Sequence, residues 1–166
     1  MELTQEYLKD HFYYNKKTGV FVKKIYFDKR GRKRGGKEHG SLCENGYIIL
    51  MINYKRYLSH RLAWFYVKGE WPENEIDHIN GIRSDNRFCN LREASRSQNQ
   101  QNRKKAQLNN KSTGIIGTYV ERATGKFYSS ITLNRKQKRL GTFNTVEQAH
   151  NAYIKAKREL HTFGML

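Results

Sequence analysis

Residues 76–102 have the sequence IDHINGIRSDNRFCNLREASRSQNQQN, and the rest of the chain is best interpreted outward from them. Residues 75–78 predict a short strand that ends in Asp77, a carboxylate suited to a hard cation, and His78, an imidazole able to exchange a proton. Because neighbouring residues of a strand point to opposite faces, both side chains reach one site only if the strand ends or kinks at His78. The turn dipeptide Asn80-Gly81 supplies that break.

The second half of the stretch predicts a helix. Residues 84–86 form another turn, and Asn90 with Glu93 has the spacing of a capping box. We expect the helix to run over residues 91–102, with Asn99 on the face that looks back at the strand end. The predicted local order is strand, loop, strand, helix.

The pattern D-H-x-N-G, D-N-R, N-L-R and a later N resembles the HNH motif of ββα-metal endonucleases, closest to those of phage and intron homing endonucleases. The resemblance implies that His78 is a general base, that Asp77 and Asn99 bind one divalent metal ion, and that Asn90 holds the histidine loop. Oxygen ligands with retained waters suit Mg²⁺ or Mn²⁺. The expected products carry 5′-phosphate and 3′-hydroxyl ends.

Each of these residues also has a simpler interpretation. An Asp-His pair at a strand end is by itself weak evidence, Asn90 could be only a helix cap, and Asn99 could belong to a solvated helix face. The joint spacing of the residues favours a site. Many HNH proteins add a zinc ion held by two Cys pairs, but Cys43 and Cys89 are solitary, so no structural zinc is predicted.

Composition favours a nucleic-acid partner. The 166 residues carry a formal net charge of +17, and 21 aromatic residues offer stacking surfaces as well as core. A membrane surface is disfavoured, because no long apolar run exists. We therefore expect double-stranded DNA as the partner, with no membrane and no obligate protein partner evident. The N-terminal sequence lacks the apolar segment of a signal peptide, and two unpaired cysteines agree with a reducing compartment, so the predicted location is the cytoplasm, that of the bacterial host if a phage encodes the protein.

The region before the motif predicts a helix over residues 3–12 and hairpins turning at Thr18-Gly19 and at Asn53-Tyr54. Ser59 is expected to cap a helix over residues 60–68. His60, at the start of that helix, is interpreted as structural. The pattern Y-x-x-H-R-L-A-W, followed by G-x-W-P, also resembles phage HNH proteins, so the first resemblance covers residues 3–102.

Residues 23–37 predict a basic, glycine-rich loop. We expect it to contact DNA phosphates, although a solvated tip would have the same composition. The residues assigned to this contact are Arg30, Arg32, Lys33 and Arg34.

The C-terminal part follows a polar, basic linker at residues 103–112. Strands are expected at residues 114–120, 126–133 and 137–143, with a helix over residues 145–160 that begins with a capping box of Asn144 and Glu147. Its apolar stripe, Val146, Ala149, Tyr153, Ala156 and Leu160, should pack on the sheet.

The segments GKFYSSI and KRLGTFNTVEQAHNAY resemble the APETALA or ethylene-response-factor DNA-binding domain, which lays a three-stranded sheet in the major groove. The sheet face expected to meet DNA holds Lys126, Tyr128, Ser130, Thr132 and Arg139. Positions that carry Arg, Glu or Trp in plant members are Ser130, Thr132 and Arg139 here, so the resemblance does not give a base preference. Residues 103–166 hold 13 basic and 3 acidic residues, which favours DNA binding.

The fold class predicted is α+β: a ββα-metal HNH nuclease domain with N-terminal β-hairpins at residues 1–102, then a three-stranded antiparallel sheet packed on one helix at residues 113–166. The predicted function is a homing-type DNA endonuclease. The alternatives are a DNA-binding regulator or packaging accessory with an inactive HNH fold, and a nuclease for structured RNA. The narrow major groove of A-form RNA suits a sheet reader less well than duplex DNA does.

Overall fold

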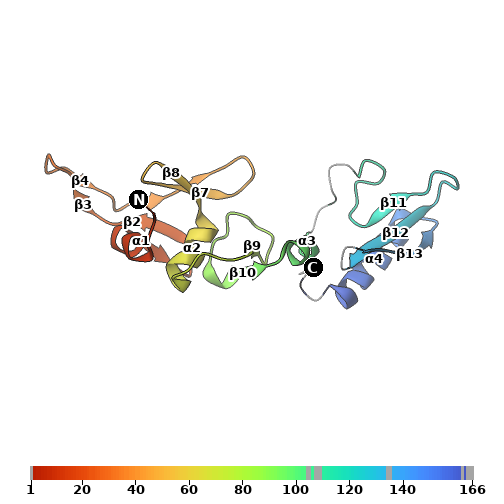
Figure 1. Cartoon of the computed structure of the whole chain (residues 1–166). Helices are drawn as coiled ribbons and strands as arrows, with labels where there is room; N and C mark the ends of the chain where they lie inside the picture. The colour runs from red at the N-terminus through yellow and green to blue at the C-terminus, as the bar shows by residue number, and fades with distance from the viewer. Residues whose placement is uncertain (1, 104–105, 107–109, 134–135, 162, 164–166) are drawn as a thin grey trace. The chain divides into compact units, whose positions relative to one another are not determined.

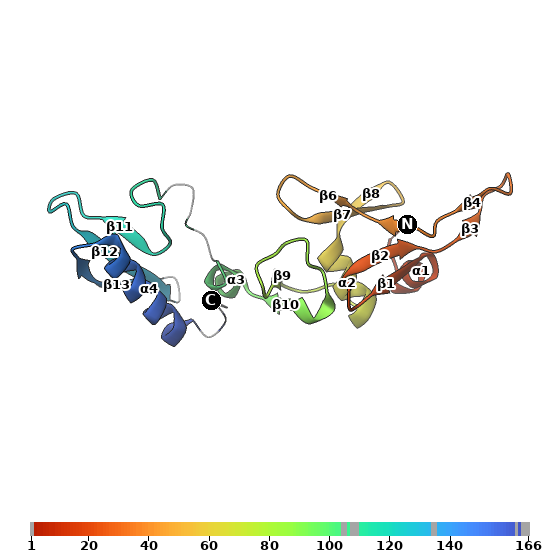
Figure 2. The same cartoon turned by 180° about the vertical axis from the view of Figure 1, so that it is seen from behind.

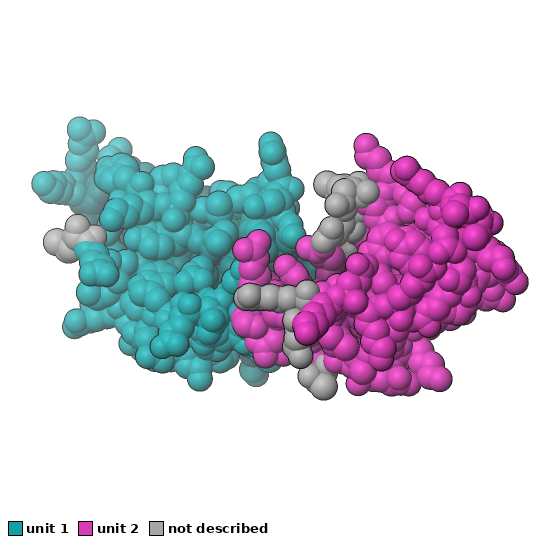
Figure 3. All heavy atoms as spheres, turned by 45° about the vertical axis from the view of Figure 1, so that its right-hand side comes forward, with its two compact units in different colours: residues 1–94 teal, residues 95–166 magenta. Residues whose placement is uncertain are grey.

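The computed structural model describes residues 2–103, 106, 110–133, 136–161 and 163. The fold is mixed α+β, as predicted, and the chain divides into two compact units, Met1–Ala94 and Ser95–Leu166, which Figure 3 colours separately. The predicted domain limits at residues 102 and 113 stay a prediction. Residues 104–105 and 107–109 of the predicted linker lie outside the described residues.

The first unit opens with helix α1 (Gln5–His11), where the Thr4 side chain accepts a hydrogen bond from the Tyr7 backbone N–H. Strands β1 (Phe12–Asn15) and β2 (Val20–Lys23) follow as the predicted hairpin, and β5 (Glu38–His39) pairs with β2. The hairpin turns through Gly19, whose φ of 76° is a conformation that glycine adopts without strain.

Strands β6 (Ser41–Leu42), β7 (Ile48–Ile52) and β8 (Lys55–Leu58) form a second antiparallel sheet. The predicted turn at Asn53 and Tyr54 is confirmed, and both residues have positive φ, as a tight two-residue hairpin turn requires.

Helix α2 (Ser59–Lys68) follows directly. The prediction that Ser59 caps this helix is wrong: Ser59 is buried inside its first turn, and the residue at the cap position, Leu58, makes no side-chain cap bond.

The basic segment at residues 23–37, predicted as a loop, contains two paired strands. Strands β3 (Tyr26–Phe27) and β4 (Lys33–Arg34) pair as a ribbon that projects beyond the sheet of β1 and β2 (Figure 1). Asp28 organises its tip, because Oδ1 accepts from the backbone N–H groups of Arg30 and Arg32 at 2.9 and 3.1 Å.

The motif region differs from its prediction in one element. Strands β9 (Glu75–His78) and β10 (Leu91–Ala94) pair antiparallel, and a 3-10 turn η1 (Phe88–Asn90) precedes β10. Helix α3 (Arg96–Gln101) starts five residues later than expected. The predicted helix start at residue 91, with Asn90 and Glu93 as a capping box, is therefore wrong. The capping box is made by Ser95 and Gln98.

Burial explains the strand at residues 91–94. Leu91 and Ala94 are buried, and pairing with β9 satisfies the backbone hydrogen bonds of residues 91–94. If these residues formed a helix, the edge of β9 would lack its partner strand. The apolar core of the first unit draws on α1, the hairpins, α2 and the β9–β10 pair: Leu3, Leu8, Phe12, Tyr14, Phe21, Leu50, Ile52, Leu62, Ala63, Phe65, Ile76 and Leu91.

The second unit holds α3 and the predicted sheet of β11 (Thr118–Val120), β12 (Phe127–Leu133) and β13 (Lys136–Phe143). Helix α4 (Val146–Leu160) packs along one face of that sheet, as Figure 2 shows from the helix side. Its predicted capping box is one residue off: Thr145 and Gln148 form it, in place of Asn144 and Glu147.

The stripe of α4 is confirmed at its centre, where Ala149, Tyr153 and Ala156 are buried and Ile131 of β12 packs against the last two. Within the described residues no helix is long and apolar enough to span a membrane.

Candidate functional site

The strand β9 ends at His78, as the sequence predicted. The Gly81 N–H donates to the His78 carbonyl at 2.8 Å, and Gly81 has a φ of 75°. The chain therefore turns sharply away after the imidazole and runs through a loop, residues 79–87, before returning along β10.

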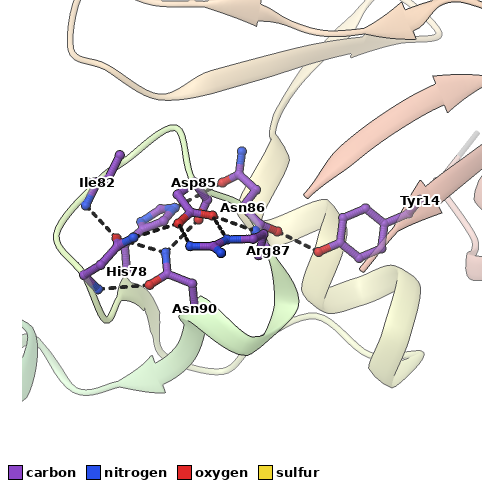
Figure 4. A network of polar contacts seen from close by, with 8 residues as sticks. Tyr14, His78, Ile82, Asp85, Asn86, Arg87 and Asn90 are labelled. Atoms are coloured by element: carbon purple, nitrogen blue, oxygen red, sulfur yellow. Dashed lines mark hydrogen bonds and ion pairs between the residues drawn. The ribbon is translucent and has the colours of Figure 1, made fainter. Parts of the chain in front are cut away.

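Asn90 closes this loop (Figure 4). Its Oδ1 accepts from the Asn80 backbone N–H at 2.9 Å, and its Nδ2 donates to the Asp85 carbonyl at 2.8 Å and to Asn80 Oδ1 at 3.0 Å. These three bonds tie the two ends of the loop together. They also explain why Asn90 does not cap a helix: its side chain is already engaged across the loop.

Asp85 is the second brace of the loop. Its carboxylate accepts from Asn80 Nδ2 at 2.7 Å, from Arg87 Nε at 2.8 Å and from Arg87 Nη2 at 2.6 Å. The hydrogen bonds from the Arg87 side chain lead the causes that lower the pKa of Asp85 to about 2. The carboxylate is therefore ionised throughout the neutral range and holds the loop as an anion.

Asn86 connects this loop to the imidazole. Its side chain is 1% exposed, and its Oδ1 lies 3.1 Å from His78 Nε2. The backbone of Asn86 is fixed from the other side, because Tyr14 Oη donates to its carbonyl at 2.6 Å. Burial raises the pKa of Tyr14, so the hydroxyl keeps its proton. Figure 4 shows the chain of contacts from Tyr14 through Asn86 to His78.

Asp77 is buried next to His78 in β9 and faces Arg92 across the strand pair. Arg92 Nε and Nη2 each lie 2.9 Å from Asp77 Oδ2. These contacts fix the orientation of the carboxylate. Arg92, expected on a helix, is thus a strand residue that braces the predicted metal ligand.

Two rings pack around His78. His60 of α2 meets it edge to face, with ring centroids 5.0 Å apart, and Tyr47 lies 5.9 Å away. Burial lowers the pKa of His60 to about 3, so this imidazole is neutral. Burial also lowers the pKa of His78, against the opposite influence of the Asn86 hydrogen bond and of Asp77 and Asp85. The neighbourhood therefore favours a neutral imidazole.

Asn99 lies on α3, where its backbone N–H donates to the Ser95 carbonyl at 2.9 Å. Helix α3 clusters with the second compact unit, so the approach of Asn99 to Asp77 stays a prediction. Among the described residues, no group of three or more His, Cys, Asp or Glu side chains gathers to hold a metal ion. A site of one carboxylate and one amide would not form such a group, and this donor set suits a hard cation that keeps several waters.

The predicted DNA contacts of the ribbon fall into two sets. Arg30 and Lys33 are exposed. The side chains of Arg32 and Arg34 are about half exposed, and their Nε atoms lie 2.9 and 3.2 Å from Asp28 Oδ2. Asp28 therefore holds two of the arginines against the ribbon.

Several residues of the predicted DNA-binding sheet face contact other side chains of the second unit. Arg139 donates from Nη2 to Glu121 Oε1 at 2.5 Å and to Thr142 Oγ1 at 2.7 Å, and its guanidinium lies 4.6 Å from the centre of the Tyr128 ring. Lys126 and Thr132 are exposed, whereas Ser130 is buried and accepts from Gln137 Nε2 at 2.7 Å. Ser130 is thus placed on the expected face but below its surface.

The sequence interpretation missed several residues around His78. It treated Asn86 as part of a turn and Arg92 as part of a helix face, and it set His60 aside as structural. Asn86 stands in the D-N-R part of the quoted motif, but its role was not predicted, because a buried asparagine and a turn asparagine look alike in an S-D-N-R segment.

The segment that holds these residues matches a known protein family. Residues 57–101 match the sequence model of a family described as HNH endonuclease, and the matched segment includes Asp77, His78, Asn90 and Asn99. No curated protein and no solved structure matches the chain. The match places an HNH endonuclease domain at residues 57–101, a type of domain that generally uses a divalent metal ion. The homing type and the resemblance of the C-terminal sheet to plant DNA-binding domains stay predictions.

Proposed function

We propose that this protein is a homing-type DNA endonuclease that hydrolyses phosphodiester bonds with one divalent metal ion and a histidine general base. One observation carries the proposal. A buried imidazole and a buried carboxylate end the strand β9, inside the segment that matches the HNH endonuclease family.

In this proposal His78 takes a proton from a water molecule, and the hydroxide attacks the phosphorus atom. The bond to the 3′ oxygen breaks, and that oxygen gains a proton from solvent, which gives 5′-phosphate and 3′-hydroxyl ends. The lowered pKa of His78 supports this role, because a neutral imidazole can accept the proton. Asn90 keeps the loop closed beneath the imidazole through its three hydrogen bonds.

Asp77 and Asn99 are proposed to hold the metal ion, Mg²⁺ or Mn²⁺. When bound, such an ion neutralises charge on the scissile phosphate and stabilises the departing 3′ oxygen. Arg92 would keep Asp77 oriented through its contacts to Oδ2.

Duplex DNA is the proposed substrate, with contacts in both units. The ribbon residues Arg30, Arg32, Lys33 and Arg34 supply positive charge to phosphates. In the second unit Lys126, Tyr128, Thr132 and Arg139 offer a polar, basic sheet face, with Ser130 beneath it. Arg139 is the residue we assign to base contact, because a guanidinium can donate two hydrogen bonds to guanine in the major groove.

The test is cleavage of supercoiled plasmid DNA with Mg²⁺ by the full chain and by His78→Ala. We expect wild type to nick or linearise the plasmid, and His78→Ala to lower the rate by roughly 100-fold or more, with DNA affinity unchanged within a few-fold. The Glu44→Gln variant, an exposed surface change, serves as the control. Full cleavage by His78→Ala would refute the base assignment.

The same assay separates the rival functions. A regulator or packaging accessory with an inactive HNH fold would bind the plasmid and leave it intact in the presence of Mg²⁺. A nuclease for structured RNA would cut a folded RNA in preference to the plasmid.

A further inference from the structure

A cleft of about 330 Å³ opens in the first unit between α1, the start of the ribbon and the β7–β8 hairpin. It is set apart from the HNH motif, because α1 and the ribbon lie at the end of the unit away from β9 (Figures 1 and 2). That volume is at the lower end of the range of small-molecule sites, which suits a ligand about the size of one nucleotide base. The walls of the cleft include Tyr7, His11, Phe12, Lys23, Tyr26 and Asn53.

The aromatic side chains of the cleft provide flat surfaces. The Tyr7 and His11 rings stack with centroids 4.0 Å apart and an interplanar angle of 17°. Tyr7 Oη donates to Asn53 Oδ1 at 2.9 Å, and this bond joins α1 to the turn of the β7–β8 hairpin. Tyr26 is 45% exposed, so much of its ring is open to a ligand. Aromatic rings of this kind can stack with any of the four bases, since every base has a π face.

The cleft and its surroundings carry positive charge. Lys23 Nζ lies 3.4 Å from Tyr26 Oη and 4.9 Å from the centre of that ring, so its ammonium group stands at the cleft wall. Exposed Lys24 follows Lys23 in the chain, and exposed Lys55 and Arg56 follow the hairpin turn. None of the described residues that line the cleft is acidic. A base attached to a phosphate backbone therefore meets complementary charge here.

Tyr54, next to Asn53 in the hairpin turn, is explained neither by packing nor by backbone preference. Its side chain is 99% exposed, so it adds nothing to the core. Its φ of 62° lies in the left-handed region, where glycine is the usual residue at this position of a two-residue turn. Backbone conformations of this kind concentrate at functional sites. An exposed ring at a hairpin tip can insert between stacked bases, as apolar side chains of DNA-bending proteins do.

We propose that this cleft binds one unpaired base of DNA, which stacks on Tyr26 and on the Tyr7–His11 pair while Tyr54 inserts at the position that the base has left. The inference rests on the proposed function in taking DNA as the ligand. Moving a paired base out of a duplex costs about as much free energy as one stacking contact returns. The cleft should therefore select DNA in which a base is already unpaired, as in a bulge or a single strand.

The first measurement is the affinity of the full chain for DNAs of one sequence, in EDTA so that no cleavage takes place. The DNAs are a paired duplex, a duplex with one bulged base and a single strand, each labelled for fluorescence anisotropy. We expect wild type to bind the bulged duplex and the single strand roughly 10-fold more tightly than the paired duplex, the effect of about one stacked base. Equal affinities would overturn the proposal. Tighter binding of an RNA duplex with the same bulge would assign the cleft to RNA and also overturn it.

Variants test whether the cleft produces this preference. Tyr26→Leu and Tyr54→Leu should each reduce it to about threefold or less, because leucine keeps apolar area and removes the flat ring. Affinity for the paired duplex should stay within about twofold of wild type. Tyr26→Phe keeps the ring and should retain the preference. Tyr13→Leu is the matched control, since Tyr13 is 54% exposed and lies on the opposite face of β1 from Phe12.

A photochemical cross-link locates the base directly. 5-Iodouracil in the bulge cross-links under ultraviolet light to an aromatic ring that stacks on it, and mass spectrometry of the peptides identifies that ring. We expect cross-links at Tyr26, His11 or Tyr54. Cross-links confined to other residues would overturn the proposal, as would a bulge preference that both leucine variants of the cleft retain. If Tyr26→Leu does not fold, Tyr54→Leu and the cross-link on wild type still decide.

Cleavage of supercoiled plasmid with Mg²⁺ separates this inference from the proposed function. Selective binding of the bulged duplex without any plasmid cleavage would refute the nuclease function and leave the base site standing. Cleavage by wild type, together with equal affinity for bulged and paired DNA, would refute the base site and leave the nuclease function standing.

Discussion

At the scale of single residues, the proposed metal ligands Asp77 and Asn99 give the first prediction. Asp77→Ala and Asn99→Ala should each abolish cleavage supported by Mg²⁺ or Mn²⁺, because a site with few protein ligands cannot replace one of them. Asp77→Ala should also weaken Mn²⁺ binding, measured by calorimetry on the full chain. Glu75→Gln, an exposed carboxylate of the same strand, is the control. Undiminished cleavage by wild type in excess EDTA would contradict the metal assignment.

Asp85 predicts a specific dependence of stability on pH. Its folded-state pKa of about 2 lies below the ordinary value of 3.8, so its contribution is present above pH 4 and is lost as the pH falls toward 2. Asp85→Asn should lower the free energy of unfolding at pH 7 by about 1 kcal/mol, a modest value because Arg87 is half exposed and water screens the pair.

Urea denaturation of Asp85→Asn and wild type at pH 7 and at pH 2.5 measures the Asp85 contribution. The gap between the two proteins should shrink at the lower pH. His60, whose lowered pKa destabilises both proteins below pH 6.5, cancels from the difference. An equal gap at both pH values would show that Asp85 acts through packing alone.

Residue identities in the motif were predictable where spacing is diagnostic. The Asp-His pair and the later asparagines are recognised by their intervals, and the family match over residues 57–101 covers all of them. The partners of these residues were not predictable. Asn86, Arg92 and Tyr14 act through contacts that depend on strand register and on a hairpin more than 60 residues away in sequence.

At the scale of elements, the largest error concerned where α3 begins. Asn90 and Ser95 each precede a good capping partner, and local sequence cannot rank them. Tertiary structure decides, because Leu91 and Ala94 are buried within the first unit and the Asn90 side chain is bonded to Asn80 and Asp85. The β12 strand shows a similar limit: alternation along the sequence predicted Ser130 on the DNA-facing side, but only the structure shows that Ser130 is buried and bonded to Gln137.

The turn between β1 and β2 predicts a strong effect of one methyl group. Gly19→Ala adds a Cβ that would lie 2.4 Å from backbone atoms of Asn86 and Arg87, at a φ of +76°. We expect a loss of about 2 kcal/mol or more in unfolding free energy, from backbone strain and from displacement of the loop.

Gly31→Ala is the matched control for the Gly19 prediction. Gly31 has a φ of +70° but nothing within 4 Å of an added Cβ, so it carries only the strain of roughly 1 kcal/mol. Urea denaturation midpoints compare the two variants, and plasmid cleavage reports whether the loop has moved. Equal effects of the two substitutions would show that the close approach at Gly19 has no energetic weight.

At the scale of the whole molecule, charge and chemistry are divided between the parts of the chain. Residues 103–166 carry a net charge of +10, and residues 1–102 carry +7 along with the HNH motif. A fragment ending near residue 110 should therefore still cut DNA, with weaker binding and reduced site preference. Residues 111–166 alone should bind duplex DNA without cutting it.

Binding of these fragments and of Arg139→Ala to target and scrambled duplexes across a salt series tests the division. Arg139→Ala should cost roughly 1 to 3 kcal/mol on the target and less on the scrambled duplex if the side chain contacts a base. An equal loss on both would indicate a phosphate contact. A folded C-terminal fragment that binds no duplex at low salt would place target recognition in the first unit.

The position of Tyr14 and Gly19 against the loop has a consequence for the portability of the motif. The segment that matches the HNH family begins at residue 57, whereas the hydroxyl and the turn that hold Asn86 belong to the β1–β2 hairpin. The Phe88 N–H also donates to the Lys16 carbonyl at 3.1 Å. A graft of residues 57–101 into another scaffold would carry the imidazole but not the β1–β2 hairpin that contacts its loop. A working graft therefore has to start upstream of residue 14.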